Sequence, residues 1–282
     1  MKKKKSARKM IITAIPYVLL TAMLAISLIP LVSMLGTSFR SRATLLTTRT
    51  IFPQEWSLEF YRTVLSDVRI LTYFKNSFVN SLITCIVTVF CSVLGGYALS
   101  RFGRKVKGIN IVVVFLLMLQ MFPTVQMIIP LYITFQNMGL INTPYVLLAC
   151  YPAFTLPMNM WMMRSFIDSV PYEMEEAGRI DGCNRFQTIT RIAVPVSKPG
   201  IASSAILAFN HCWNEFLLAM ILIKKDNYRT MPVGLNNYMQ ENSADWGSIM
   251  AAATLMLIPV LLFLNVLQKN IVGGLTVGSV KG

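Results

Sequence analysis

The sequence predicts an all-α polytopic membrane protein with six transmembrane helices. Of its 282 residues, 55% are hydrophobic and only 13% are charged. This composition is too apolar for an ordinary soluble domain. The apolar residues are also gathered into long runs that short polar or basic segments separate, as expected of a chain that crosses a bilayer several times.

The first predicted span is the apolar run 11–34, which follows the basic residues 2–9. A cleavable signal peptide is the alternative for this start. The run is too long for a signal-peptide core and has no clear cleavage site of small residues, so a retained helix is favoured. Residues 36–75 are too polar to span and predict an outside segment with an amphipathic helix at 58–65.

The remaining five spans follow further along the chain. They are predicted at 76–100, 109–135, 144–163, 200–223 and 248–267. Pro123 and Pro130 interrupt the third of them. Three parts result: residues 1–71 with the first helix and outside loop, a core at 72–267 that includes a polar loop at 168–199, and a glycine-rich tail at 268–282.

Charge placement predicts the orientation. Six spans put both termini on one side, and 17 of the 26 Lys and Arg residues fall in the segments of that side. Basic residues concentrate in cytoplasmic segments. Both termini and the loop 168–199 are therefore expected in the cytoplasm. The net charge of +14 is then explained by topology and by contact with lipid head groups, and no nucleic-acid binding is predicted.

The loop 168–199 reads as two short helices joined by a tight turn. Pro171 suits a first helical turn, and Gly182 suits the left-handed position that ends a helix. Asn184 followed by Gln187 resembles a capping box that starts the second helix. Pro195 is expected to stop that helix. A plain solvated connection between spans is the alternative reading of such a loop.

The second helix of this loop has an apolar side suited to docking. Phe186, Ile189 and Ala193 are spaced so that they share one helical face.

The spacing within the loop resembles the EAA loop of bacterial ABC importer permeases. That pattern is E-A-A-x-x-x-G, nine residues, I-x-L-P, and Gly178 and Val194 are its two mild departures here. The matching positions are Glu176, Ala177, Gly178, Asp181, Gly182, Ile192 and Pro195.

The resemblance implies a type I ABC importer permease fold in the bacterial cell membrane and a loop that docks on a separate ATPase. Glu176 would pair with a basic residue of that ATPase, while Glu175 is expected to matter less.

The fifth span is unusually polar for a membrane helix. It contains Asn210, His211, Trp213, Asn214 and Glu215. Three readings stay open: hydrogen-bonding between helices, lining of a translocation pathway, and, least favoured, proton coupling. A helical spacing of four would place His211 and Glu215 on one face.

The run 213–216 resembles the fifth helix of carbohydrate-type permeases, in particular the smaller maltose-type subunit, and the tail 273–282 resembles the same group. The resemblance covers about residues 72–282. It implies import of a sugar or oligosaccharide with a second permease subunit, two ATPase subunits that bind ATP-Mg, and an extracytoplasmic solute-binding protein.

The chain itself is predicted to be no enzyme and to hold no cofactor or metal. It contains no nucleotide-binding or hydrolase motif and a single histidine, and its five cysteines lack metal-ligand spacing. The alternatives are an ABC importer permease for a different small solute, a self-sufficient secondary transporter, and a membrane protein without transport activity. The secondary transporter would show a sequence repeat, and none is seen.

Overall fold

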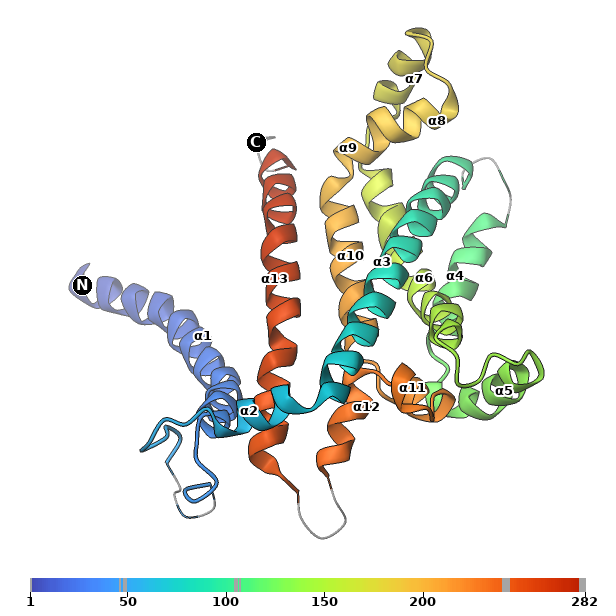
Figure 1. Ribbon diagram of the computed structural model, residues 1–282. Coiled ribbons are helices and arrows are strands. Elements are labelled where there is room, and N and C mark those ends of the chain that lie inside the picture. Colours follow the sequence, from blue (N-terminus) through green and yellow to red (C-terminus); the bar gives the residue numbers. More distant parts are fainter. Residues whose placement is uncertain are drawn as a thin grey trace. The chain divides into compact units, whose positions relative to one another are not determined.

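The computed structural model describes residues 2–45, 47, 50–103, 106, 108–239 and 244–278. Within these ranges the chain is helical, without strands and with one isolated bridge between Met239 and Ala244 (Figure 1). The all-α class is thus confirmed. The helices are α1 Lys2–Ser38, α2 Glu59–Ser66, α3 Val68–Phe102, α4 Ile109–Leu119, α5 Thr124–Asn137, α6 Tyr145–Asp168, α7 Tyr172–Ile180, α8 Arg185–Thr188, η1 Ile189–Ala193, α9 Val194–Val196, α10 Lys198–Trp213, α11 Leu217–Leu222, η2 Asp226–Tyr228, α12 Met231–Leu235, η3 Asn236–Tyr238 and α13 Trp246–Gly278.

The chain forms two compact units. One comprises Met1–Asp67 with Asn237–Leu257, and the other comprises Val68–Asn236 with Ile258–Gly282. Four described helices, α1, α3, α6 and α13, are long and apolar enough to cross a membrane. Two bent helix pairs raise the number to six if each pair is one span. Each of the six predicted spans overlaps one of these segments, although the fifth, 200–223, does so only over 200–213.

The second unit is built around α3, α6 and α10. Ring and hydroxyl contacts fix their directions: Thr88 on α3 meets Thr155 on α6, and Ser100 meets Asp168, so these helices run parallel. On α10, the Phe209 ring meets Phe78 and the Trp213 ring meets Phe74, so α10 runs antiparallel to α3.

Small polar side chains hold these three helices together in the interior. The hydroxyls of Thr88 and Thr155 lie 2.7 Å apart, and Ser204 on α10 donates to Asn159 on α6 at 2.7 Å. The amide of Asn159 donates in turn to the Thr155 carbonyl oxygen at 2.7 Å. Small residues permit close approach of spanning helices, and paired hydroxyls and amides add specificity where no water competes.

The third predicted span is broken at Pro123. The axes of α4 and α5 differ by 90°, and Pro123 stands in extended geometry at the start of α5. A proline disfavours helical geometry in the residue before it, which explains the break. Pro130 was also expected to interrupt this span, but it lies inside the continuous helix α5.

Turns that the topology assigns to one side lie together in the second unit. Asn142, between α5 and α6, donates its N–H to the carbonyl oxygen of Leu222 and accepts from the N–H of Lys225 at 3.1 Å. At the opposite ends of these helices, Arg101 bonds to the Val170 carbonyl oxygen. The grouping of turns therefore agrees with the sequence, whereas the choice of cytoplasmic side stays a prediction.

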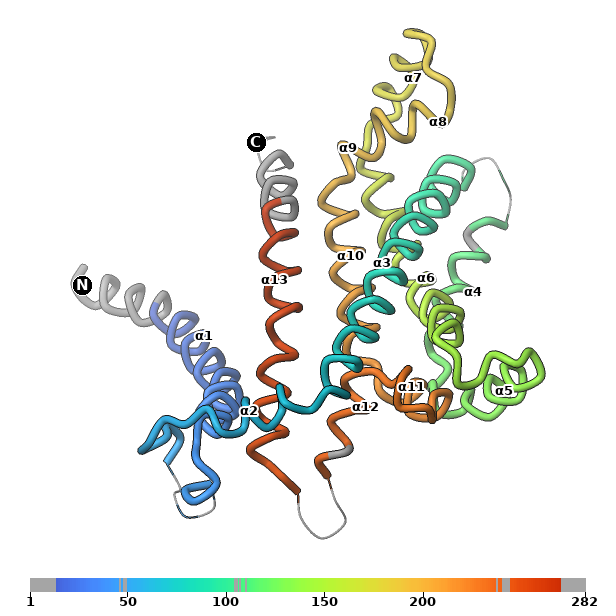
Figure 2. The backbone as a smooth tube through the Cα atoms, in the orientation of Figure 1, coloured from blue at the N-terminus to red at the C-terminus, as the bar shows by residue number. Residues whose placement is uncertain are grey.

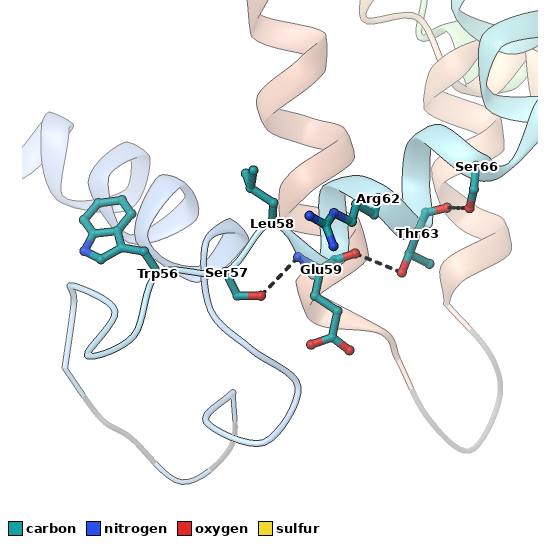
Figure 3. A pocket seen from close by; sticks show the side chains of 7 residues that line it. All are labelled: Trp56, Ser57, Leu58, Glu59, Arg62, Thr63 and Ser66. Atoms are coloured by element: carbon teal, nitrogen blue, oxygen red, sulfur yellow. Dashed lines mark hydrogen bonds between the residues drawn. The ribbon is translucent and has the colours of Figure 1, made fainter.

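The segment 36–75 contains the predicted amphipathic helix as α2. Phe60 and Val64 are fully buried on its inner face. A shallow surface hollow lies along its outer face and is lined by Trp56, Ser57, Leu58, Glu59, Arg62, Thr63 and Ser66 (Figure 3). The hydroxyl of Thr63 donates to the Glu59 carbonyl oxygen of the same helix. The Thr63 hydroxyl in the hollow thus bonds within α2.

The last helix is longer than predicted. α13 continues from Trp246 to Gly278, so the described part of the expected tail is helical. Residues 279–282 of that tail lie outside the described residues, as do Lys105 and two neighbours in the basic turn 101–108.

Candidate functional site

The loop between α6 and α10 contains two capped helices and a tight turn, as predicted. α7 begins directly after Pro171, one position later than expected. Gly182 adopts a φ of +88°, which an L side chain rarely takes. The N–H of Gly182 donates to the Arg179 carbonyl oxygen and that of Cys183 to the Gly178 carbonyl oxygen. This pair of bonds is the Schellman motif that closes helices at a glycine.

The second loop helix starts with the predicted capping box. The Asn184 side chain accepts from the Gln187 N–H at 2.9 Å, and the Gln187 side chain accepts from the Asn184 N–H at 2.8 Å. In Figure 2 the turn that joins α7 to α8 projects beyond the ends of α6 and α10.

The expectation that Pro195 stops this helix is wrong. The helix continues as a π-helix over Ile189–Ala193 and then as α9 to Val196. In the π-turn the Val194 N–H donates to the Ile189 carbonyl oxygen, five residues back. Pro195 then occupies an early position of α9, where a missing N–H costs no hydrogen bond. The chain bends by 81° just after it, between Val196 and Lys198.

The predicted coupling residues separate into two faces. Glu176, Ala177, Asp181, Gly182 and Pro195 are exposed, whereas Gly178 is buried and Ile192 is half-buried. A Cβ added at Gly178 would lie 2.3 Å from Ile192 Cδ1. The departure from the family's second alanine therefore coincides with a close contact between the two loop helices.

The apolar docking face expected on the second loop helix is divided. Ala193 is buried and Ile189 packs beside it against Tyr97, Met163 and Ile167. Phe186 is 66% exposed instead. The face was predicted from helical spacing alone, which cannot say which part of an apolar stripe the same chain covers.

Glu175 is the residue that sequence reasoning undervalued. Its side chain is fully buried, and its Oε1 atom lies 2.8 Å from Arg101 Nε and 2.7 Å from Arg101 Nη2. Its Oε2 atom accepts from the Tyr97 hydroxyl at 2.7 Å. Glu175 lies three residues before Gly178, so both face inward on α7. The feature of the sequence that pointed to this buried face is Gly178, a glycine within a short charged helix.

One arginine of α3 and one of the loop stack on the ring of Tyr172. The Arg101 guanidinium lies 6.0 Å from the Tyr172 ring centroid, and that of Arg179 lies 5.8 Å from it. The hydrogen bond between Arg179 and the Tyr172 hydroxyl raises the pKa of Arg179. Arg179 therefore stays charged on the exposed side of α7.

The polar fifth span is a broken helix. α10 ends at Trp213 and α11 begins at Leu217, and Glu215 bridges the break. Its carboxylate accepts from the N–H groups of Leu218 at 2.7 Å and Ala219 at 3.1 Å, and from the buried Tyr151 hydroxyl at 3.1 Å. An acidic side chain thus caps the first turn of α11.

The other polar residues of this span lie on its outer surface. Asn210, His211 and Asn214 are exposed in this chain, and the Asn214 amide donates to the side-chain oxygen of Asn210 at 2.9 Å. The Trp213 ring is buried and stacks 5.7 Å from Phe209. Because α10 ends at Trp213, the helical spacing expected of His211 and Glu215 does not continue between them.

Among the described residues, no group of three or more His, Cys, Asp or Glu side chains is placed to hold a metal ion. The five cysteines are unpaired thiols. Cys85, Cys150 and Cys212 are buried in the helix interfaces. They act there as small apolar residues.

A set of apolar spanning segments with an exposed, capped helix-turn-helix between two of them defines a multi-pass membrane permease. Residues 92–277 match the family model described as "Binding-protein-dependent transport system inner membrane component". The chain belongs to this family of ABC importer permeases.

Curated relatives cover almost the whole chain. The probable ABC transporter permease protein YurM of Bacillus subtilis is 36% identical over 253 residues, which are 90% of this chain and 83% of that protein. The trehalose/maltose transport system permease protein MalG of Thermococcus litoralis is 35% identical over 263 residues, which are 92% and 94% of the two chains.

A solved structure shares the fold. A chain of a bacterial ABC transporter involved in the import of the acidic polysaccharide alginate superimposes with a TM-score of 0.78 at 23% identity, covering 92% of this chain and 96% of that one. The type I importer fold predicted from the sequence is therefore confirmed.

Proposed function

We propose that this chain is the permease subunit of an ATP-driven importer that moves a sugar or oligosaccharide across the cell membrane. The carbohydrate class is supported by the relatives. They include permeases of systems for trehalose and maltose in Thermococcus litoralis, diacetylchitobiose in Streptomyces coelicolor and galactooligosaccharides in Bacillus subtilis. The run 213–216 in the fifth span supports the same class.

The observation that carries the proposal is the division of α7 into two faces. Glu175 and Gly178 are buried against the same chain, while Glu176, Ala177 and Asp181 of the motif are exposed. An exposed motif on a rigidly capped helix suits docking to another protein. Its partner in this proposal is an ATPase, and two such subunits bind ATP-Mg and hydrolyse it. The chain itself is then no enzyme and holds no cofactor.

The fifth span contributes to the translocation pathway in this proposal. Asn210, His211 and Asn214 present polar groups on one exposed surface, suited to the hydroxyls of a sugar. Trp213 and Glu215 fix the break that orients them, through ring stacking and helix capping. A broken helix belongs where it lines a cavity or packs on protein.

The remaining partners follow from the uncovered surfaces. Residues 14–31 of α1 are all exposed in this chain, so lipid or a second permease subunit is expected to cover them. The opposite side of the membrane would receive an extracytoplasmic solute-binding protein. In this proposal both termini and the loop 168–199 lie in the cytoplasm. The chain divides by function into residues 1–71, 72–267 and 268–282.

The test is reconstitution with the second permease, the ATPase and the binding protein. Glu176→Ala is expected to reduce the ATPase bound per complex and the binding-protein-stimulated turnover, because truncating one side of an interfacial charge contact costs about 2–5 kcal/mol. Glu173→Ala, at an exposed position of the same helix, is the weaker control, because Glu173 shares roughly the face of Glu176.

Three outcomes contradict parts of the proposal. Unchanged ATPase stoichiometry in the Glu176 variant leaves the loop as a solvated connection. Uptake that persists without any ATPase indicates a secondary transporter. ATP-driven uptake of amino acids or metals in place of labelled sugars moves the chain to another class of importer.

A further inference from the structure

The short helix α7 has few covalent constraints on its position. Only residues 169–171 join it to α6, and the turn at 181–184 joins it to α8. A docking helix on such connections could shift without moving the spans. Contacts made by its side chains therefore decide what moves with it.

The strongest of these contacts is the Glu175 cluster, which we define as Tyr97, Arg101 and Glu175. Both carboxylate oxygens of Glu175 are used: Oε1 receives two nitrogens of the Arg101 fork and Oε2 receives the Tyr97 hydroxyl. The Glu175 side chain is 0% exposed and that of Arg101 is 11% exposed. Paired, charge-assisted bonds of this kind are both short and directional.

Arg101 extends the cluster to a third element. Its Nη2 donates to the Val170 carbonyl oxygen at 3.0 Å, in the link between α6 and α7, and its Nη1 donates to Ser100 Oγ. Ser100 donates in turn to Asp168 at the end of α6, at 2.6 Å. The ends of α3 and α6 and the whole of α7 are thereby joined through one guanidinium.

Burial makes this junction hard to open. Separating α7 from α3 would break the buried, charge-assisted bonds of Glu175 to Arg101 and Tyr97, which is more costly than breaking an exposed pair. The acids on either side do not share this position, since Glu173 and Glu176 are exposed. On α7, Glu175 thus bonds within this chain, whereas the next residue, Glu176, is exposed.

We propose that the Glu175 cluster makes α7 move as one body with the cytoplasmic ends of α3 and α6, so that displacement of the docking helix is transmitted directly to those two spans. The inference rests on the proposed function, because it presumes that an ATPase moves α7. Glu175, Arg101 and Tyr97 act here as positioning residues. They transmit motion and contact neither ATP nor substrate.

The first test compares coupling with assembly. Glu175→Gln keeps the shape of the side chain and removes its charge. In the reconstituted complex it is expected to retain ATPase stoichiometry and stimulated hydrolysis, while the sugar imported per ATP hydrolysed falls by a large factor. Tyr97→Phe, which removes one bond and leaves the ion pair, is expected to lie between Glu175→Gln and the native chain. Glu173→Gln is the matched control, at an exposed acid of the same helix.

The second test measures the motion itself. Spin labels at Ile180 on α7 and Phe90 on α3, which are 87% and 62% exposed, are placed in the full complex after the five native cysteines are replaced. The distance between the labels is expected to be the same with and without ATP in the native background. In Glu175→Gln it is expected to broaden or to change with ATP.

The outcomes separate the inference from the function on which it rests. A native chain that retains no ATPase removes the proposed function. A native complex that works while its label distance changes with ATP overturns the one-body inference. A Glu175→Gln complex with an unchanged sugar-to-ATP ratio also overturns it. A Glu175→Gln complex that loses the ATPase, as Glu176→Ala is expected to do, overturns it as well, because Glu175 would then act in docking.

Discussion

Replacing Glu215 by alanine is expected to destabilise the break in the fifth span strongly. Three hydrogen bonds end on this carboxylate: two from the first N–H groups of α11 and one from the Tyr151 hydroxyl. Loss of an N-terminal cap costs about 0.5–2 kcal/mol. The Tyr151 hydroxyl, which is buried, is left without this acceptor at a cost of about 1–3 kcal/mol. Together these losses amount to about 1.5–5 kcal/mol.

The assay is thermal inactivation of the purified permease in detergent, with sugar uptake in proteoliposomes as a second reading. Glu215→Gln keeps a carbonyl oxygen that can accept, so its midpoint is expected between those of the native chain and Glu215→Ala. Tyr151→Phe removes the hydroxyl that would be orphaned. The double variant should therefore lose less than the sum of the two single variants.

Two results would refute this reasoning. If Glu215→Ala has the same midpoint temperature of inactivation as the native chain, the carboxylate does not hold the break. Strict additivity with Tyr151→Phe would mean that the bond between these two residues contributes nothing.

Two further predictions concern the turn of the loop and the orientation of the chain. Gly182→Pro is expected to abolish coupled transport while the protein still reaches the membrane, because proline fixes φ near −65° and Gly182 requires +88°; normal uptake by this variant would contradict the role of the turn. A membrane-impermeant thiol reagent applied from outside is expected to label a cysteine placed at Asn137 and to leave one placed at Lys105 unlabelled, and the reverse pattern would invert the orientation.

Local features of the fold were the most predictable from the sequence. The capping box at Asn184 and Gln187 and the glycine turn at Gly182 depend on residues within three positions of each other, and both are confirmed. The break at Pro123 likewise follows from one residue. Such features are set by the backbone preferences of a few neighbouring residues.

Features that depend on distant partners were predicted less well. Glu175 and Glu176 are adjacent acids that look alike in the sequence, and only the position of Arg101 on another helix decides that Glu175 is buried. The sequence predicts a continuous fifth span over 200–223, whereas Glu215 lies in a break at 214–216 and caps the helix that follows. Pro195 was misjudged because the π-turn before it shifts the hydrogen bonds, which residue type alone does not reveal.

The π-turn at Ile189–Ala193 also sets a rule for exchanging loops between permeases. Such a turn is wider than an α-helical turn by one residue. Deleting one residue within this turn, such as the exposed Thr190, would convert it to an α-helical turn and leave the residues on either side on nearly the same faces. Ala193 would still face the interior. A grafted loop can therefore lack this one residue, whereas a change of length in the regular helix α8 would rotate the residues that follow by about 100° per residue.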